Sequence, residues 1–291
     1  GALTNLNTLS STGQSVVLDG GSWSPSGNIN AGLTTLQNNG TLTVTDYSAA
    51  NLIFTDGTLT ATGALTNLNA LSSTNQSVVI SGGTWSPSGN IRPGLVDLQN
   101  NGVLNVGDFD AATLTITDGT LTATGALTNL NALSSSDQSV VIDGGTWSPS
   151  GTIGNGATTL QNDATVRVGS FDATNLTFTS GTLHASGALS HLPTLTAGTI
   201  TRITGKGSLE FTGEGSLSTT TTLDGGKLYV DALDLAPHTF TTGTISAAGT
   251  LSNVPAITAG QTIDIILGGN FASAPTLNGG TLNVSNFDAS G

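Results

Sequence analysis

Short segments in which apolar and polar residues alternate recur along the whole chain, each directly after a glycine. The clearest examples are residues 40–44, Gly-Thr-Leu-Thr-Val, and residues 57–61, Gly-Thr-Leu-Thr-Ala. Alternation of this kind places Leu and Val on one face of a β-strand and Thr on the other. The phrase returns in related form at Gly102, Gly119, Gly181, Gly226, Gly243 and Gly280. The pattern predicts short strands after tight turns, and no stretch has the spacing of a helix.

The sequence also repeats with a longer period, of 62 residues. The phrase Gly-Ala-Leu-Thr-Asn-Leu-Asn begins at Gly1, Gly63 and Gly125, and related phrases begin at Gly187 and Gly249. Self-similarity at a fixed period is typical of solenoids, in which each unit packs only against its neighbours. We therefore expect a single β-solenoid domain over 1–291, part of a longer array or polymer, with repeats 1–62, 63–124, 125–186, 187–248 and a partial repeat 249–291.

Each repeat is too long for one coil, so it must contain several. Two segments compete for the third strand, the Trp phrase and the Val-Val run that contains Val79. The partial repeat favours the Val run, because the segment from Phe271 to Leu282 is too short to close a coil. The expected coils then run from Leu59 to Val79, from Val79 to Leu104 and from Leu104 to Leu121, and the middle coil is the longest.

The long middle coil is expected to carry a loop of about eight residues around Gly-Gly-Thr-Trp-Ser-Pro-Ser-Gly, since proline suits a turn better than a strand interior. Unequal coils argue against a left-handed solenoid with a strict hexapeptide count. The fold class that we expect is all-β, a right-handed parallel β-helix of about 14 coils with three coils per 62-residue repeat.

Tryptophan recurs at one position of the repeat. Trp23, Trp85 and Trp147 are followed there by Leu209 and Phe271. An exposed ring would stack on sugars or pack against a neighbouring fibre, whereas a ring at the base of the loop would pack against the solenoid. The change to Leu favours packing, because a sugar platform needs an aromatic ring. The candidates for ligand or lateral contact are Trp23, Trp85, Trp147 and Phe271.

Charge and composition exclude several classes of function. Five basic residues against eighteen acidic ones give a net charge of −13, which repels nucleic acid. The chain has no cysteine, and its Asp-Gly pairs lack the spacing of a calcium loop, so we expect no metal and no cofactor. No apolar run has the length of a membrane helix, so we expect no membrane insertion.

The enzyme hypothesis rests on Glu210 and Glu214, which lie near Asp224, Asp231 and Asp234 in sequence. A polysaccharide hydrolase needs two carboxylates that converge across a cleft. Near-identical repeats give little reason for one unique site, so we expect no catalytic residue. Ice binding through rows of outward Thr is a further alternative, disfavoured because Arg167 and His184 interrupt the rows.

The phrase Gly-Gly-Thr-Leu-Asn-Val at 279–284 and its relatives resemble the strand repeats of autotransporter passengers and filamentous-haemagglutinin-like bacterial adhesins. The resemblance implies a secreted β-solenoid at the bacterial cell surface and brings no catalytic residues. We expect an extracellular structural protein that forms a surface fibre or adhesin stalk, with copies of itself as partners, end to end or lateral. The termini show no polar cap, which favours end-to-end stacking. The alternative is an adhesion module that binds surface glycans through the Trp loops.

Overall fold

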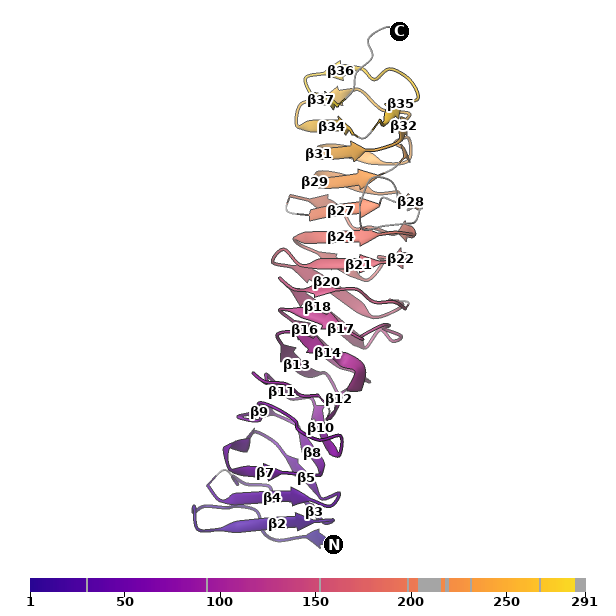
Figure 1. The fold of residues 1–291 in the computed structure, drawn as a ribbon. Coiled ribbons are helices and arrows are strands. Elements are labelled where there is room, and N and C mark those ends of the chain that lie inside the picture. The colour runs from indigo at the N-terminus through magenta and orange to yellow at the C-terminus, as the bar shows by residue number, and fades with distance from the viewer. Residues whose placement is uncertain are drawn as a thin grey trace. The chain divides into compact units, whose positions relative to one another are not determined.

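The computed structural model describes residues 1–29, 31–92, 94–151, 153–197, 199–203, 216–217, 220–230, 232–266 and 268–285. In these residues nearly every element is a short β-strand that pairs in parallel with strands one coil before and one coil after (Figure 1). The described helices are two single turns, η1 (Ala49–Asn51) and η2 (Ala111–Thr113). The predicted fold class, a right-handed parallel β-helix of about 14 coils, is confirmed.

The structure divides into two compact units, and the first comprises residues 1–130 and 135–141. Its longest sheet contains, in order of pairing, β1 (Ala2–Leu3), β3 (Ser22–Trp23), β5 (Thr41–Val44), β8 (Gly57–Ala61), β10 (Gln76–Ser81), β12 (Leu95–Gln99) and β15 (Leu114–Ile116). A second sheet contains β6 (Tyr47–Ser48), β9 (Ala64–Thr66), β11 (Thr84–Trp85), β13 (Gly102–Val106) and β16 (Gly119–Ala123). A third contains β2 (Ser15–Asp19), β4 (Leu33–Gln37) and β7 (Leu52–Phe54), while β14 (Phe109–Asp110) pairs with β17 (Ala126–Thr128).

The core of this unit is a ladder of inward apolar side chains. In the longest sheet, the successive partners are Leu3, Trp23, Leu42, Leu59, Val78, Val96 and Leu114. The Thr residues between them face outward, as the alternation predicts. The members of this ladder from Trp23 to Val96 are buried between the coil before and the coil after, so stability depends on the stacking of neighbours.

The coils of this unit are shorter and more even than expected. Six coils separate Leu3 from Leu114 in the ladder, whereas three coils per repeat would place the sixth partner at Leu127, two repeats after Leu3. A repeat holds more than three coils here, so the expected three coils and the long middle coil are wrong in this unit. Leu65, one repeat after Leu3, accordingly pairs with Trp85 in a different sheet. The expected step from Leu104 to Leu121 is confirmed.

The strand at the Val-Val run exists, but the residue chosen for the core was wrong. Val17 faces outward and is 59% exposed, whereas its neighbours Val16 and Leu18 are buried. In the second repeat, Leu59 pairs with Val78, the residue directly before Val79. Consecutive apolar residues carry no alternation, so the sequence does not show which of them face the core.

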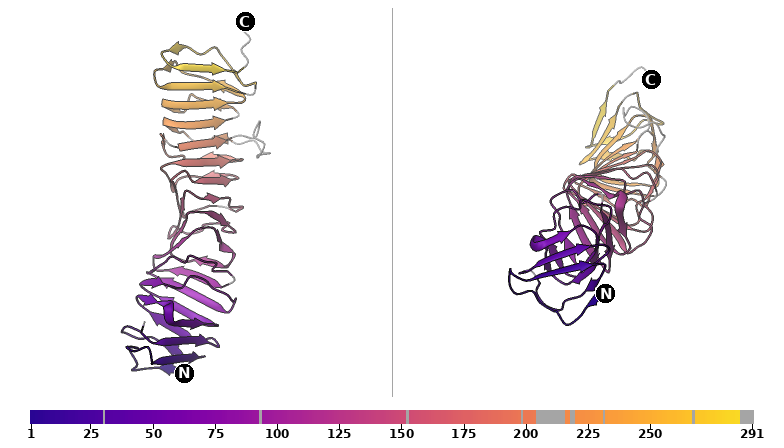
Figure 2. Two further views of the ribbon diagram at one scale, coloured as in Figure 1. Left: turned by 60° about the vertical axis from the view of Figure 1, so that its left-hand side comes forward. Right: turned by 60° about the horizontal axis from the view of Figure 1, so that its bottom comes forward.

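The second unit comprises residues 131–134 and 142–291, and the boundary falls within β18 (Gln138–Asp143). Its longest run of paired strands is β19 (Thr146–Trp147), β21 (Thr165–Val168), β24 (Gly181–Ala185), β27 (Thr199–Ile203), β29 (Thr222–Val230), β31 (Thr239–Ala247), β34 (Gln261–Ile265) and β37 (Thr281–Val284), with β26 (Leu195–Thr196) also on β29. β20 (Ala157–Gln161) pairs with β23 (Leu176–Phe178). Short sheets pair β22 (Phe171–Asp172) with β25 (Ala188–Ser190) and β28 (Ser216–Leu217), β30 (Leu233–Asp234) with β32 (Thr250–Ser252) and β35 (Asn270–Phe271), and β33 (Ile257–Thr258) with β36 (Leu277–Asn278). Figure 2 shows the long run of this unit as a stack of strands that all point the same way.

Repeat and coil stay in phase over part of the second unit. Val166, Leu183, Thr201 and Leu228 are successive partners, and the step from Thr201 to Leu228 is the longest of the three. Val166 and Leu228 occupy the same position in consecutive repeats and lie three coils apart, as predicted. The long last step takes in residues 204–215, which lie outside the described part of the chain.

The expected Trp loop is a strand of the solenoid in all three repeats. Trp85 in β11 pairs with Leu65 on one side and with Leu104 on the other. The residues after it are also wound into the coil, because the N–H of Gly89 donates to the carbonyl of Asn69 (2.8 Å). The prediction forced a choice between the Trp and Val segments, but a coil that uses several faces needs both as strands.

Candidate functional site

The three tryptophans lie in the core. The exposed fractions of Trp23, Trp85 and Trp147 are 2%, 1% and 1%. The indole Nε1–H of Trp85 donates to the carbonyl oxygen of Leu68 at 2.7 Å, and Trp23 donates to Leu6 at 2.6 Å. The rings therefore present no face to a sugar or to a neighbouring fibre, and packing accounts for their recurrence.

In the sequence, Leu209 and Phe271 occupy the position of the tryptophans in the last two repeats. The one that the structure describes, Phe271, also packs within the solenoid. Phe271 is half-buried in β35 and pairs with Leu251, as Trp85 pairs with Leu65. Leu209 lies outside the described residues, and the residue that pairs with Leu189 is Leu217. The position equivalent to Trp in this repeat is therefore held by a later leucine than the spacing predicts.

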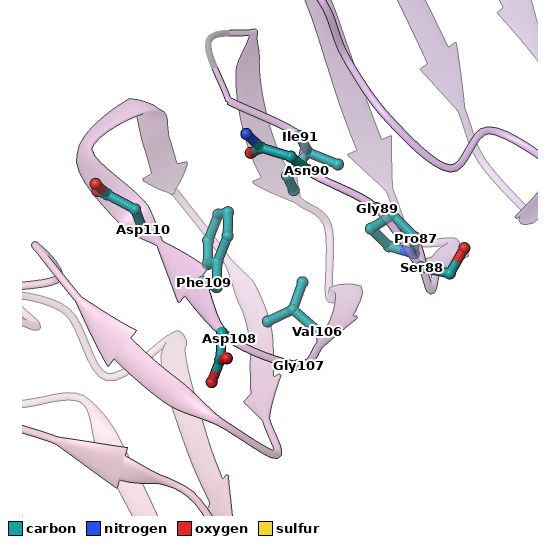
Figure 3. Close-up of a pocket in the computed structure, with 10 residues that line it drawn as sticks. All are labelled: Pro87, Ser88, Gly89, Asn90, Ile91, Val106, Gly107, Asp108, Phe109 and Asp110. Carbon is teal, nitrogen blue, oxygen red and sulfur yellow. The ribbon is translucent and has the colours of Figure 1, made fainter.

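A surface hollow of the first unit lies between residues 87–91 and 106–110 and has a volume of about 340 Å³. Figure 3 shows the ring of Phe109 facing Asn90 and Ile91 across it, with the carboxylates of Asp108 and Asp110 turned away from each other. Both carboxylates are engaged within the solenoid. Asp108 accepts the N–H of Ala126 (2.6 Å), and Asp110 accepts the N–H of Ala112 and pairs with Arg92. The hollow offers no uncommitted pair of carboxylates for acid–base chemistry.

The proposed enzyme residues Glu210 and Glu214 lie outside the described residues, as does Asp231. Asp224 accepts a hydrogen bond from the hydroxyl of Thr242 (2.8 Å). Asp234 accepts the N–H of Ala236 (3.0 Å) and the amide of Asn253 (2.9 Å), and these bonds hold the pKa of that carboxyl below its usual value. The two described carboxylates of this group thus bond to the solenoid itself.

Polar side chains at the corners of the coils form a recurring bond from one coil to the next. An Asn amide donates to an Asp or Ser oxygen one coil earlier in each case. The pairs are Asn38 to Asp19, Asn67 to Ser48, Asn100 to Ser81, Asn129 to Asp110 and Asn253 to Asp234, at 2.6 to 2.9 Å. The five Asn residues Asn38, Asn67, Asn100, Asn129 and Asn253 have positive φ, which Asn tolerates better than most residues. We call these contacts the corner pairs.

A glutamine fixes another corner. Gln76 is 3% exposed, and its Oε1 accepts the backbone N–H groups of Ser72 (2.5 Å) and Ser73 (2.8 Å). Its Nε2 donates to the carbonyl oxygen of Phe54 in the preceding coil. Gln14 and Gln138 hold equivalent corners, so Ser-Ser-x-x-Gln marks this feature in the sequence. Sequence reasoning missed both the glutamines and the corner pairs.

The outward threonines do not form a continuous row. Thr41 pairs with Thr58 and Thr43 with Thr60, but Thr60 next pairs with Val79. A flat array of identical hydroxyls, which ice binding requires, is interrupted after two strands.

The residues that the structure describes contain no group of three or more His, Asp or Glu side chains placed to hold a metal ion. No helix among them is long and apolar enough to cross a membrane. Comparison with protein-family models, with curated proteins and with solved structures gives no match to this chain.

Proposed function

We propose that this chain is an extracellular structural protein, a stretch of β-solenoid that builds a surface fibre or the stalk of an adhesin, and that it does not act as an enzyme. The observation that carries this proposal is the use of the corner pairs. Carboxylates and amides that a binding or catalytic site would turn toward a ligand bond instead to the neighbouring coil.

The bonding between successive coils suits a protein that bears mechanical load. Backbone pairing, a filled apolar interior and corner bonds all connect one coil to the next, so both units are stabilised along the direction in which their coils stack. A spacer or stalk must resist the separation of its coils when it is pulled along this direction, and every coil must contribute to that resistance.

The partner that we propose is a second copy of the chain. Within the described residues, successive coils pair through backbone bonds of parallel strands, so a coil of another copy can add by the same bonds. Light scattering and electron microscopy of the purified chain test this part. Fibres or oligomers are expected at micromolar concentration, whereas a strict monomer with no fibres would contradict self-association.

The extracellular location is tested separately. Antibodies against the chain should label intact cells, and brief protease treatment of intact cells should remove the label. Label that appears only after the cells are permeabilised would contradict an extracellular role, whatever the oligomeric state.

A further inference from the structure

Basic residues are rare in this chain, yet they gather on one sheet of the second unit. Only five of the 291 residues are Lys or Arg, against eighteen acidic residues. Three of the five, Arg167, Arg202 and Lys227, belong to the consecutive paired strands β21, β24, β27 and β29 (Figure 1). Such a concentration in an acidic chain suits a partner of opposite charge.

The register places these residues in two adjacent rows. In one row Arg167 pairs with His184, His184 with Arg202, and Arg202 with Tyr229. Lys227 lies in β29, two residues before Tyr229, and belongs to the neighbouring row, in which it pairs with Ile200. Because alternate residues of a strand share a face, both rows lie on one face of the sheet. We call the two rows together, with Arg167, His184, Arg202, Tyr229 and Lys227, the basic row of the second unit.

The face is accessible where its side chains are described. Lys227 is exposed, and Arg167, His184 and Tyr229 are half-buried. Their inward neighbours Val166, Leu183 and Leu228 are buried in the core, which fixes the outward direction of the row.

No carboxylate occupies these two rows in the described residues of the four strands. The first acid beyond them is Asp264 in β34, and it already accepts a hydrogen bond from the hydroxyl of Ser246 (3.2 Å). Asp224, near the opposite end of β29, is bonded to Thr242. Along the described strands the row thus carries basic and aromatic side chains at successive positions, and no acid alternates with them.

We propose that the basic row binds an anionic polysaccharide, a glycan that carries uronate or sulfate groups. Strands in a sheet lie about 4.8 Å apart, so the row from β21 to β29 extends over roughly 14 Å. An extended glycan that runs along the stack would meet a cationic or aromatic residue at successive strands. Arg pairs with carboxylate or sulfate through a planar fork of donors, and Tyr229 supplies a ring for a sugar face.

A polysaccharide fits better than a nucleic acid. Duplex DNA carries one charge per about 1.7 Å of its axis, and a chain of net charge −13 repels so dense an anion. A glycan carries at most a few charges per sugar, and local contacts with a few cations suffice to hold it.

The test measures binding of the full chain to immobilised polygalacturonate, which carries only carboxylates, and to dextran sulfate, which carries only sulfates, with neutral dextran as the blank. We expect binding to at least one anionic glycan, weakened by added salt. Arg167→Gln and Lys227→Gln should each weaken it by roughly tenfold, the loss of one charge-assisted contact. The two glycans distinguish carboxylate from sulfate recognition.

Arg92→Gln is the matched control, because it removes the same charge from the first unit, on a segment outside the strands of the basic row. The control should bind like the unmodified chain. Equal weakening by all three substitutions, unchanged binding in Arg167→Gln and Lys227→Gln, or equal binding to neutral dextran would overturn the proposal. So would tighter binding of a single-stranded oligonucleotide, or a dimer in sedimentation that Lys227→Gln dissolves. None of these readings depends on fibre formation, so the proposed structural role is tested apart from this one.

Discussion

Trp85 donates its indole N–H to the carbonyl oxygen of Leu68 in the preceding coil, 2.7 Å away. The ring itself is 1% exposed. One side chain thus fills the core and also bonds the backbone of the neighbouring coil. The most distinctive residue of the repeat is in this way part of the packing, although its recurrence in the sequence also suits a binding surface.

Substitutions of Trp85 should lower the free energy of unfolding, and the loss should be larger the more of the side chain is removed. Trp85→Ala empties the ring site and is expected to lower the free energy of unfolding by about 3–5 kcal/mol. Trp85→Phe keeps an aromatic ring, as Phe271 does naturally, and should cost about 1–3 kcal/mol, because it leaves the Leu68 carbonyl without its donor. Urea unfolding measures both. Stability that is unchanged in Trp85→Ala would show that the ring is not packed.

Much of the fold could be predicted because its strands alternate strictly. Leu42 and Leu59 stand between threonines, so their inward direction and their spacing of one coil could both be read from the sequence, and the structure pairs them. The run Val16-Val17-Leu18 offers no such contrast, and the register at that strand was off by a single position.

The coil length was harder to predict, because a repeat need not contain a whole number of coils. Leu3 and Leu65 are equivalent in sequence, yet they lie in different sheets. The corner pairs depend on that length. Asn129 can be matched with Asp110 in the sequence only when the length of one coil is known, because that length decides which residues lie side by side.

Gln76 should be a strong determinant of stability. Gln76→Leu leaves the N–H groups of Ser72 and Ser73 without their acceptor, and the loss of each buried partner costs about 1–3 kcal/mol. We expect the free energy of unfolding to fall by about 2–4 kcal/mol in urea.

Gln99→Leu is the control for that substitution. Gln99 is only half-buried, and its amide bonds to the side chain of Asp97, so its loss should change stability by about 0.5 kcal/mol or less. Equal effects of the two substitutions would show that the corner at Gln76 does not depend on its amide.

Tyr47 should make the first unit sensitive to alkali. Burial raises the pKa of Tyr47 to about 12 from its ordinary value of 10.0. Above pH 10 the unfolded chain releases this proton first, so stability is lost as the pH rises toward the folded pKa. At pH near 11 the loss should be about 1 kcal/mol relative to pH near 9.

Tyr47→Phe isolates this effect, because Phe109 and Phe171 occupy the equivalent position in the next two repeats. Urea unfolding at both pH values should show a smaller alkaline loss in the variant by about 1 kcal/mol. An identical loss in both proteins would assign the sensitivity to other groups.

His238 should respond to acid. Its Nδ1 accepts the N–H of Thr221 (3.1 Å), and burial lowers the pKa of the imidazole, although Asp234 nearby opposes that shift. Below pH about 6.5 the unfolded chain takes up the proton more readily, so stability falls with decreasing pH as His238 charges and its Nδ1 ceases to accept.

Hydrogen exchange of the Thr221 amide, corrected for the intrinsic rate, measures this response. Protection should be lower at pH near 5 than at pH near 7.5, and His238→Gln should remove the difference. The same protection at both pH values in the unmodified chain would contradict the assigned bond.

The central claim is that this solenoid works as a structural element outside the cell. Cryo-electron microscopy of native surface material, labelled with antibodies against the chain, tests it most directly. The account predicts labelled filaments or stalks whose strands stack with a spacing of about 4.8 Å along the axis. Label confined to dispersed particles inside the cell, with no filament or stalk at the surface, would contradict it.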